Sequence, residues 1–184
     1  MAEPSRVVEI TESQMTQEQK AVLADLVAGR GKMPSPYKIW FHSPKLAAGM
    51  EKIGTFLNKR GSLTTREVEL VICLIAHHWK GEYVWASHVS TCLELGYPVA
   101  VFEAIRKGQA PALENERELT VYDLAMISMQ PGPGPDEVFN RAEKLLGRNG
   151  IAEVLALLGY YTAVVLGMKV HRVAVRDEIP ASVR

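Results

Sequence analysis

One segment of the chain, from Arg66 to His88, holds several residues that commonly act as acids, bases or metal ligands. It contains Glu69, the neighbours His77 and His78, and the sequence Tyr-Val-Trp-Ala-Ser-His at positions 83–88. Histidine titrates near neutral pH, and carboxylates exchange protons or bind metals. The composition is therefore compatible with a metal site, a redox site or an acid/base site, and spacing must distinguish between them.

The two adjacent histidines do not have the spacing of a metal site. Neighbouring residues on a helix lie about 100° apart around its axis, so His77 and His78 cannot readily bind one ion from one face. The segment also has no His-Glu-x-x-His or Glu-x-x-His pattern. We therefore expect no metal, and we interpret the histidine pair as favourable charge near a helix C-terminus.

The whole chain predicts an all-α fold, a compact bundle of about eight helices. Apolar residues recur mostly at spacings of three and four, and the alternation typical of strands is rarely sustained. Caps, prolines and glycines delimit predicted helices at 16–29, 43–61, 64–81, 82–95, 98–108, 113–129, 135–146 and 151–175. The Pro-Gly repeat at 131–135 is predicted to connect two of them. We expect one domain over residues 1–184.

The helices 64–81 and 82–95 are predicted to position the reactive residues. If they are antiparallel and joined at Lys80-Gly81, they can bring Glu69 and His88 together. Glu69 borders the apolar stripe of its helix, where a carboxylate is costly to bury without a partner. The spacing favours a Glu69–His88 pair, which is either an acid/base pair or a buried contact that holds the two helices together.

The stretch from Glu69 to Tyr97 resembles the carboxymuconolactone decarboxylase family, which shares its fold with the alkyl hydroperoxidase D proteins. The segments HSPKLAAGMEKIGTFL before it and LLGYYTAVVLGMKV after it also look like longer members. The peroxidase branch of this superfamily has a glutamate, a Cys-x-x-Cys pair and a histidine, and Glu69 and His88 match the first and last of these. Gly81 and Val84 stand where that branch has its cysteines.

The absence of these cysteines disfavours thiol peroxidase chemistry. Such a reaction needs a thiolate that attacks the peroxide and a second thiol close enough to form a disulfide. The chain's two cysteines, Cys73 and Cys92, lie in separate predicted helices without Cys-x-x-Cys spacing, and we interpret them as buried, unreactive thiols. A hydroperoxidase that uses either of them stays open as an alternative.

The decarboxylase branch resembles this sequence more closely, since its members commonly have a tyrosine, a tryptophan and a histidine in this spacing without the cysteines. The resemblance implies cofactor-independent loss of carbon dioxide from a small carboxylated lactone or ring compound. His88 would donate the proton to carbon, and Glu69 would orient His88 or shuttle the proton. Tyr83 and Trp85 would shape the substrate pocket. His42 would also enter it, although a residue just before a helix N-cap is more often a local packing element.

Composition limits the partners. Lys plus Arg and Asp plus Glu both total 21, so there is no basic surface for nucleic acid or an anionic membrane. The N-terminal sequence lacks a basic segment followed by an apolar core, so we expect a cytoplasmic protein. A small-molecule substrate without a cofactor is the expected partner, and a lactone hydrolase, an isomerase or a non-catalytic binding protein stay open. The resemblance implies a homo-oligomer, a trimer or hexamer, and the apolar segment Ile151 to Met168 is expected to be buried within or between subunits.

Overall fold

The structure is a computed structural model of the chain that describes residues 4–175 and 178–184. Within these ranges it contains helices and no strand, which confirms the predicted all-α fold. The α-helices are α1 (Gln17–Arg30), α2 (Ser35–Trp40), α3 (Pro44–Lys59), α4 (Thr65–His78), α5 (Glu82–Glu94), α6 (Val99–Arg106), α7 (Glu116–Ser128) and α8 (Asp136–Val170). Two short 3-10 helices are η1 (Glu12–Gln14) and η2 (Ala181–Val183).

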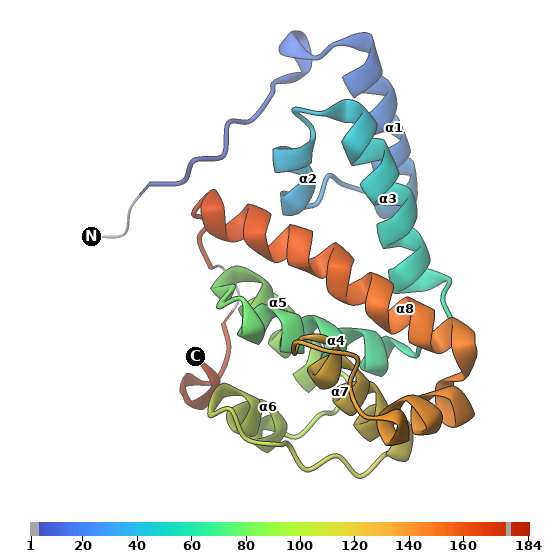
Figure 1. Ribbon diagram of the computed structural model, residues 1–184. Coiled ribbons are helices and arrows are strands. Elements are labelled where there is room, and N and C mark those ends of the chain that lie inside the picture. The colour runs from blue at the N-terminus through green and yellow to red at the C-terminus, as the bar shows by residue number, and fades with distance from the viewer. Residues whose placement is uncertain (1–3, 176–177) are drawn as a thin grey trace.

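Helix α8 lies between two groups of helices (Figure 1). Helices α1, α2 and α3 lie above it in this view, and α4 to α7 lie below it. Helix α4 packs against α5, α7 and α8, and α5 also contacts α8. Most residues of α4 between Val68 and Ala76 are buried, so α4 is the centre of the lower group. The α4–α5 pair is thus held in place from several sides.

Local sequence signals explain where α4 begins and ends. The Oγ1 atom of Thr64 accepts from the backbone N–H of Glu67 at 3.2 Å, and Oε2 of Glu67 accepts from the N–H of Thr64 at 2.8 Å. This is the predicted capping box. At the other end, the N–H of Gly81 donates to the carbonyl of Ala76 at 2.8 Å, which closes a Schellman turn at Lys80. Helix α5 begins at the next residue, so a short turn joins the two helices.

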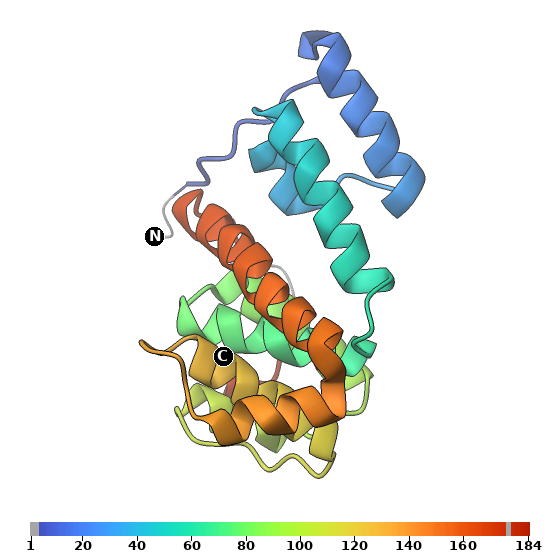
Figure 2. The same ribbon diagram turned by 45° about the vertical axis from the view of Figure 1, so that its right-hand side comes forward.

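One helix differs from the prediction. The sequence did not predict α2, whose six residues are too short to show a period. The predicted break after residue 146 lies within α8, at Gly147, whose φ of 71° and ψ of 171° are not helical, so α8 consists of two helical parts joined at a kink. Figure 2 shows the change in direction of α8 at this point. The kink lets the first part of α8 pack on α7 while the second part crosses the molecule.

The apolar part of α8 is buried along one face. It has a window of mean hydropathy 1.8 in which 50% of the residues are buried. Length and composition alone would also suit a membrane span, but the core helix of a soluble protein has the same properties. The expected burial of Ile151 to Met168 is therefore met on one face, while Leu155, Leu166 and Val170 are exposed.

Candidate acid/base site

The structure brings Glu69 of α4 and His88 of α5 into direct contact. Nδ1 of His88 lies 2.6 Å from Oε2 of Glu69, and the His88 and Glu69 side chains are 21% and 12% exposed. A carboxylate accepts hydrogen bonds, so Nδ1 carries the proton in this contact. No described residue hydrogen-bonds to Nε2 of His88. Nε2 is therefore the ring nitrogen available to exchange a proton with a ligand.

His88 lines a pocket of about 410 Å³ to which four helices contribute. The lining comes from α5 (Tyr83, Val84, Ser87, His88), α8 (Tyr160, Tyr161, Val164), α3 (Asn58), and the segment 32–38, which includes the first residues of α2. Small-molecule sites usually have volumes of about 300–1,000 Å³. The pocket is therefore large enough for a compound with a single ring, and it places such a compound against His88.

Two tyrosines of α8 organise the wall next to His88. The ring of Tyr161 packs edge-on against the imidazole of His88, with 5.4 Å between the ring centroids. The hydroxyl of Tyr161 donates to Oδ1 of Asn58 at 3.0 Å, which links α8 to α3. The hydroxyls of Tyr160 and Tyr37 lie 3.2 Å apart, and either can be the donor. These contacts fix the orientation of the imidazole and supply hydroxyl groups to the pocket.

Tyr83 also lines this pocket. Its hydroxyl donates to Oγ of Ser35 at 3.0 Å, across the pocket from α5 to α2. Ser35, Tyr37, Asn58, Tyr160 and Tyr161 were not predicted. The adjacent tyrosines in the otherwise aliphatic sequence of α8 were a signal that sequence reasoning missed.

The pocket also contains two lysines, which differ in their pairing. Nζ of Lys38 lies 2.5 Å from Oε1 of Glu9, so its charge is already partnered. Among the described residues, Lys32 has no carboxylate partner, and its side chain is exposed at the pocket. Lys32 is thus a cation that could pair with an anionic ligand, and nothing in its sequence context singled it out.

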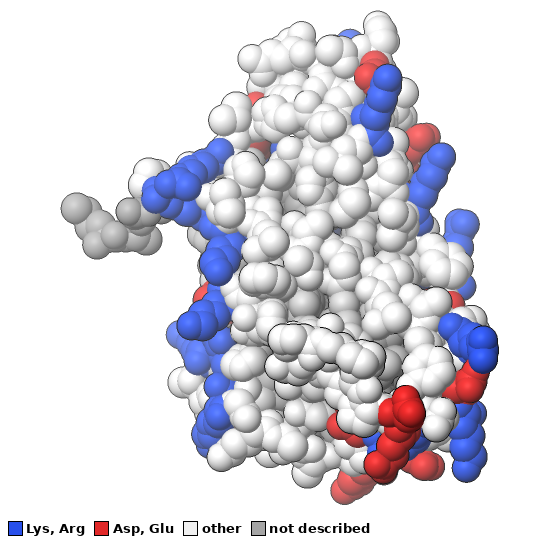
Figure 3. All heavy atoms as spheres, viewed as in Figure 1, with Lys and Arg blue, Asp and Glu red and all other residues white. Residues whose placement is uncertain are grey.

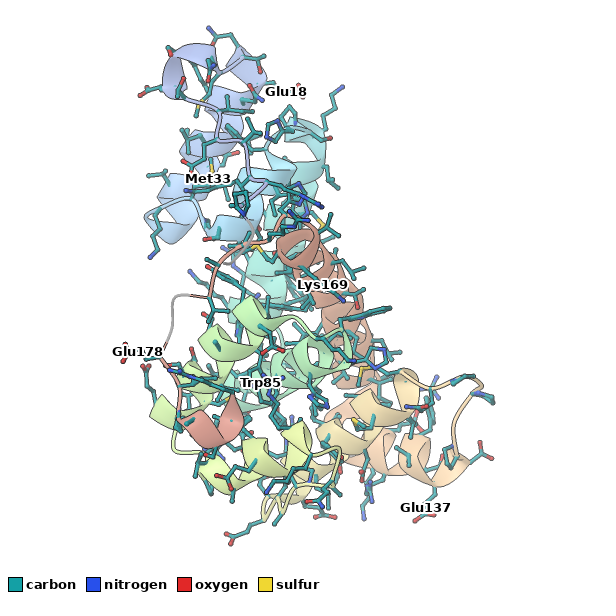
Figure 4. All side chains as sticks on the ribbon, turned by 90° about the vertical axis from the view of Figure 1, so that its left-hand side faces the viewer. Glu18, Met33, Trp85, Glu137, Lys169 and Glu178 are labelled. Carbon is teal, nitrogen blue, oxygen red and sulfur yellow. The ribbon has the colours of Figure 1, made fainter. Side chains whose placement is uncertain are left out.

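Trp85 does not lie on this pocket. It is fully buried, and its Nε1 donates to the carbonyl of Val183 at 2.7 Å. The guanidinium of Arg106 lies 4.6 Å from its ring centroid. Figure 4 shows Trp85 within the lower group of helices and apart from Met33, which lines the pocket. The physical reason is helical geometry: a residue two positions after Tyr83 points about 200° away from it around the axis.

His42 also lies outside the pocket. Its Nε2 lies 2.8 Å from the carbonyl oxygen of Val8, to which it can donate. It lines a separate depression of about 110 Å³ with Lys38 and His171. His42 therefore attaches the N-terminal segment to the helices. This is a role in local packing, and His42 does not enter the His88 pocket.

The positions of the missing redox cysteines are filled by tight packing. A Cβ atom on Gly81 would lie 2.4 Å from Cγ1 of Val165, and Val84 is buried. The Sγ atoms of Cys73 and Cys92 lie 3.8 Å apart, a contact that their sequence spacing did not predict. Both thiols are fully buried, and neither lines the pocket. Burial raises the pKa of the Cys73 thiol well above its usual value, as does its hydrogen bond with Cys92, so little thiolate forms at neutral pH.

Within residues 4–175 and 178–184, no three side chains of His, Cys, Asp or Glu are grouped so that they could hold a metal ion. What the site offers is a carboxylate–imidazole pair, several hydroxyl groups and one unpaired lysine around a pocket. Such an arrangement can donate and accept protons and can stabilise a negative charge on oxygen.

Two solved structures of the debrominase Bmp8 are similar to this chain over nearly its whole length. A cysteine-to-alanine variant in complex with 2,3,4-tribromopyrrole has a TM-score of 0.68 and 12% identity, and the match covers 99% of this chain and 95% of that one. The apo enzyme has a TM-score of 0.64 and 15% identity, with 96% and 92% covered. No family model and no curated protein matches the sequence. The likeness shows that this chain has the all-helical fold of that debrominase.

Proposed function

We propose that this protein is an enzyme that transfers a proton to carbon in a small ring compound, with His88 as the proton donor and Glu69 as the residue that positions it. The observation that carries the proposal is the 2.6 Å contact between Nδ1 of His88 and Oε2 of Glu69 at the wall of a pocket. The reaction we favour is cofactor-independent decarboxylation of a carboxylated lactone or ring acid. A debrominase that binds a small brominated ring has the same fold, which supports a small-molecule substrate.

Decarboxylation makes defined demands on these residues. The bond between the ring carbon and the carboxylate breaks, and its electron pair stays on that carbon, delocalised as an enolate. Protonated His88 then gives the proton on Nε2 to the carbon, while Glu69 continues to accept from Nδ1–H. The imidazole regains a proton from water, which reaches its partly exposed side chain.

The remaining polar groups of the pocket suit the developing negative charge. The hydroxyl of Ser35, whose oxygen accepts from Tyr83, can donate its own hydrogen to an enolate oxygen, and the contact with Tyr83 holds it in place. Lys32 can attract the anionic substrate to the pocket. The segment 32–38 and α8 are remote in sequence from the acid/base pair, so the pocket is complete only when α2, α5 and α8 are assembled.

Carbon dioxide release from a panel of carboxylated lactones and ring acids tests the proposal. We expect His88→Gln to lower turnover by about 100-fold or more, because general acid catalysis contributes about 10²–10⁴ in rate. His42→Gln is the matched control, since His42 lies outside the pocket and should leave turnover unchanged. Wild-type turnover in folded His88→Gln and Glu69→Gln proteins would overturn the assigned roles.

The same panel separates the alternative functions when it is run in D₂O. A decarboxylase places deuterium on the carbon that lost carbon dioxide. An isomerase or a hydrolase of lactones would use the same His88–Glu69 pair and would change the substrate without releasing carbon dioxide. A non-catalytic binding protein would show neither product, and His88→Ala would then change only its stability.

A further inference from the structure

A second cavity lies where the end of α4 meets α6 and α7. Its volume is about 320 Å³, and the residues that line it do not overlap with those of the His88 pocket. Apolar side chains from all three helices form much of its wall, namely Leu74, Ile105, Met126 and Met129. Polar side chains also line it, namely His77, His78, Lys80, Gln109, Tyr122 and Gln130.

Lys80 occupies a backbone position at which a side chain is unfavourable. Its φ is 54°, in the left-handed region that glycine adopts more readily. Helices α5 and α6 have glycines at the corresponding position, Gly96 with φ 83° and Gly108 with φ 68°. The Schellman turn after α4 is closed by backbone hydrogen bonds alone, since the N–H of Lys80 donates to His77 at 3.1 Å and the N–H of Gly81 to Ala76 at 2.8 Å. The lysine side chain therefore contributes nothing to the turn that glycine would not.

Lys80 brings a positive charge to the cavity, and no carboxylate of the described residues pairs with it. None of the described lining residues is an Asp or Glu, and within the described parts of the chain the Lys80 side chain makes no ion pair. An unpaired cation above an apolar cavity favours a ligand that carries a negative charge. A lysine at a backbone position that favours glycine needs an explanation, and a role of its side chain in binding such a ligand supplies one.

The wall beside Lys80 is polar and uncharged. Burial lowers the pKa of His77, and the positive charge of Arg106 lowers it further, so the ring is neutral at neutral pH. Nδ1 of His77 is buried without a hydrogen-bond partner among the described residues. A neutral imidazole offers one donor and one acceptor, and it does not repel the Lys80 ammonium.

We propose that this cavity binds a small organic anion, an apolar ring with one carboxylate, whose carboxylate pairs with Lys80. The ring would lie against Ile105 of α6, Met126 of α7 and Met129 at the C-terminal end of α7, and the flexible methionine side chains adapt to flat ligands. The volume is near the lower end of the range for small-molecule sites, about 300–1,000 Å³, which limits the ligand to a compound of one ring. This site is separate from His88 and does not depend on the function proposed above.

Ligand-observed ¹⁹F NMR with 4-fluorobenzoate as the probe tests the site. The titrations use a Ser87→Trp background, in which a large side chain fills the His88 pocket, so that remaining binding belongs to the second cavity. We expect Lys80→Gly to weaken binding by about tenfold or more, since one charge-assisted contact is lost. Lys80→Gly should also raise the melting temperature, because glycine relieves the backbone strain. Met126→Trp should abolish binding by filling the cavity.

Three comparisons make the result specific. Arg172→Gly removes a cation with φ 52° after the end of α8, outside this cavity, and should leave binding unchanged. Lys80→Arg keeps the charge and should retain binding. The neutral probe 4-fluorobenzyl alcohol should bind more weakly than 4-fluorobenzoate by about tenfold. Binding that survives Lys80→Gly, or that disappears with Ser87→Trp and persists with Met126→Trp, would overturn the proposal.

Discussion

At the scale of single residues, the two nitrogens of His88 differ in their surroundings. Nδ1 donates to Glu69, which orients the imidazole, and Nε2 has no partner among the described residues and would exchange the proton in the proposed reaction. Glu69 does not line the pocket, so in the proposed reaction it would act through His88 and not on the substrate. A glutamine at position 69 can hydrogen-bond to either tautomer and no longer holds the proton on Nδ1. We therefore expect Glu69→Gln to lower kcat with little change in KM, measured by steady-state kinetics on whichever substrate releases carbon dioxide. A raised KM with unchanged kcat would instead place Glu69 in substrate binding.

The buried thiols allow a direct test of the hydroperoxidase alternative. Cys73 and Cys92 are close enough to interact but are fully buried, and burial raises the pKa of Cys73. Because the thiolate is the reactive form, we expect the free-thiol titre of the folded protein to be unchanged after exposure to excess hydrogen peroxide. Both thiols should react once the protein is unfolded in guanidinium. Rapid thiol loss in the folded protein, with peroxide consumed, would favour the peroxidase.

Glu67 has a second role beside its place in the capping box. Its buried carboxylate, 2% exposed, pairs with Nε of Arg117 at 2.8 Å, and the Arg117 side chain is 38% exposed. We expect Arg117→Ala to lower the free energy of unfolding in urea by about 1–3 kcal/mol, since a buried carboxylate loses a charged partner. The control is Arg148→Ala, whose side chain is 85% exposed and pairs with Glu143, and which should change stability by less than about 1 kcal/mol. Equal effects of the two substitutions would contradict this expectation.

At the scale of helices, the close approach of α5 to α8 depends on the absence of a side chain at Gly81. A Cβ there would lie 2.4 Å from Cγ1 of the fully buried Val165. We expect Gly81→Ala to be destabilising, by about 1–3 kcal/mol, and the added Val165→Ala to recover part of the loss. A double-mutant cycle measured by urea unfolding should therefore show coupling between these positions. A cysteine introduced at position 81 would make the same steric contact with Val165.

Gly49 provides the matched control for this experiment. It lies within α3, and a Cβ atom on it would have no neighbour within 4 Å. Gly49→Ala should therefore be neutral or stabilising, because alanine favours the helix and reduces the entropy of the unfolded chain. A loss of stability as large as that of Gly81→Ala would mean that steric contact with Val165 is not the cause.

Predictions from the sequence succeeded where a short segment determines the structure. Thr16 with Gln19, and Thr64 with Glu67, form capping boxes in the structure as their spacing predicted. Helix α2 was missed because few residues are involved. The break predicted after residue 146 is present as the kink at Gly147, but the sequence does not show that helical hydrogen bonding resumes directly after it.

The site could be predicted only along α4 and α5. The spacing of Glu69 and His88 was enough to propose their contact, because both helices were recognisable and a short turn joins them. The opposite wall, with Tyr37, Asn58 and Tyr160, depends on how α2, α3 and α8 pack, which no local pattern encodes. The helical period alone places Trp85 and Tyr83 on different faces of α5, whereas the family resemblance suggested that both shape the pocket.

At the scale of the whole molecule, one face of α8 is apolar and open to solvent. Among the exposed residues of α8 from Ala152 to Val170, Lys169 near its end is charged, and the others carry no charge and recur mostly at spacings of three and four: Ala152, Leu155, Ala156, Gly159, Ala163, Leu166 and Val170. Figure 3 shows the corresponding face of the molecule with few charged side chains, while Lys and Arg lie along both of its sides. The face has both large residues and small ones, so it can complement a second copy of itself. The homo-oligomer implied by the family resemblance stays a prediction, and this face is where it can be tested.

We therefore expect the protein to associate through α8 and to elute at a mass above the 20.4 kDa of one chain in size-exclusion chromatography with light scattering. The double substitution Leu155→Glu and Leu166→Glu should lower the mass to that of a monomer, because carboxylates are costly to bury at such an interface. Phe139→Glu is the control, since Phe139 is equally exposed but lies in the part of α8 before the kink at Gly147. A monomeric wild-type protein, or an oligomer that the double substitution leaves intact, would show that this face does not join subunits.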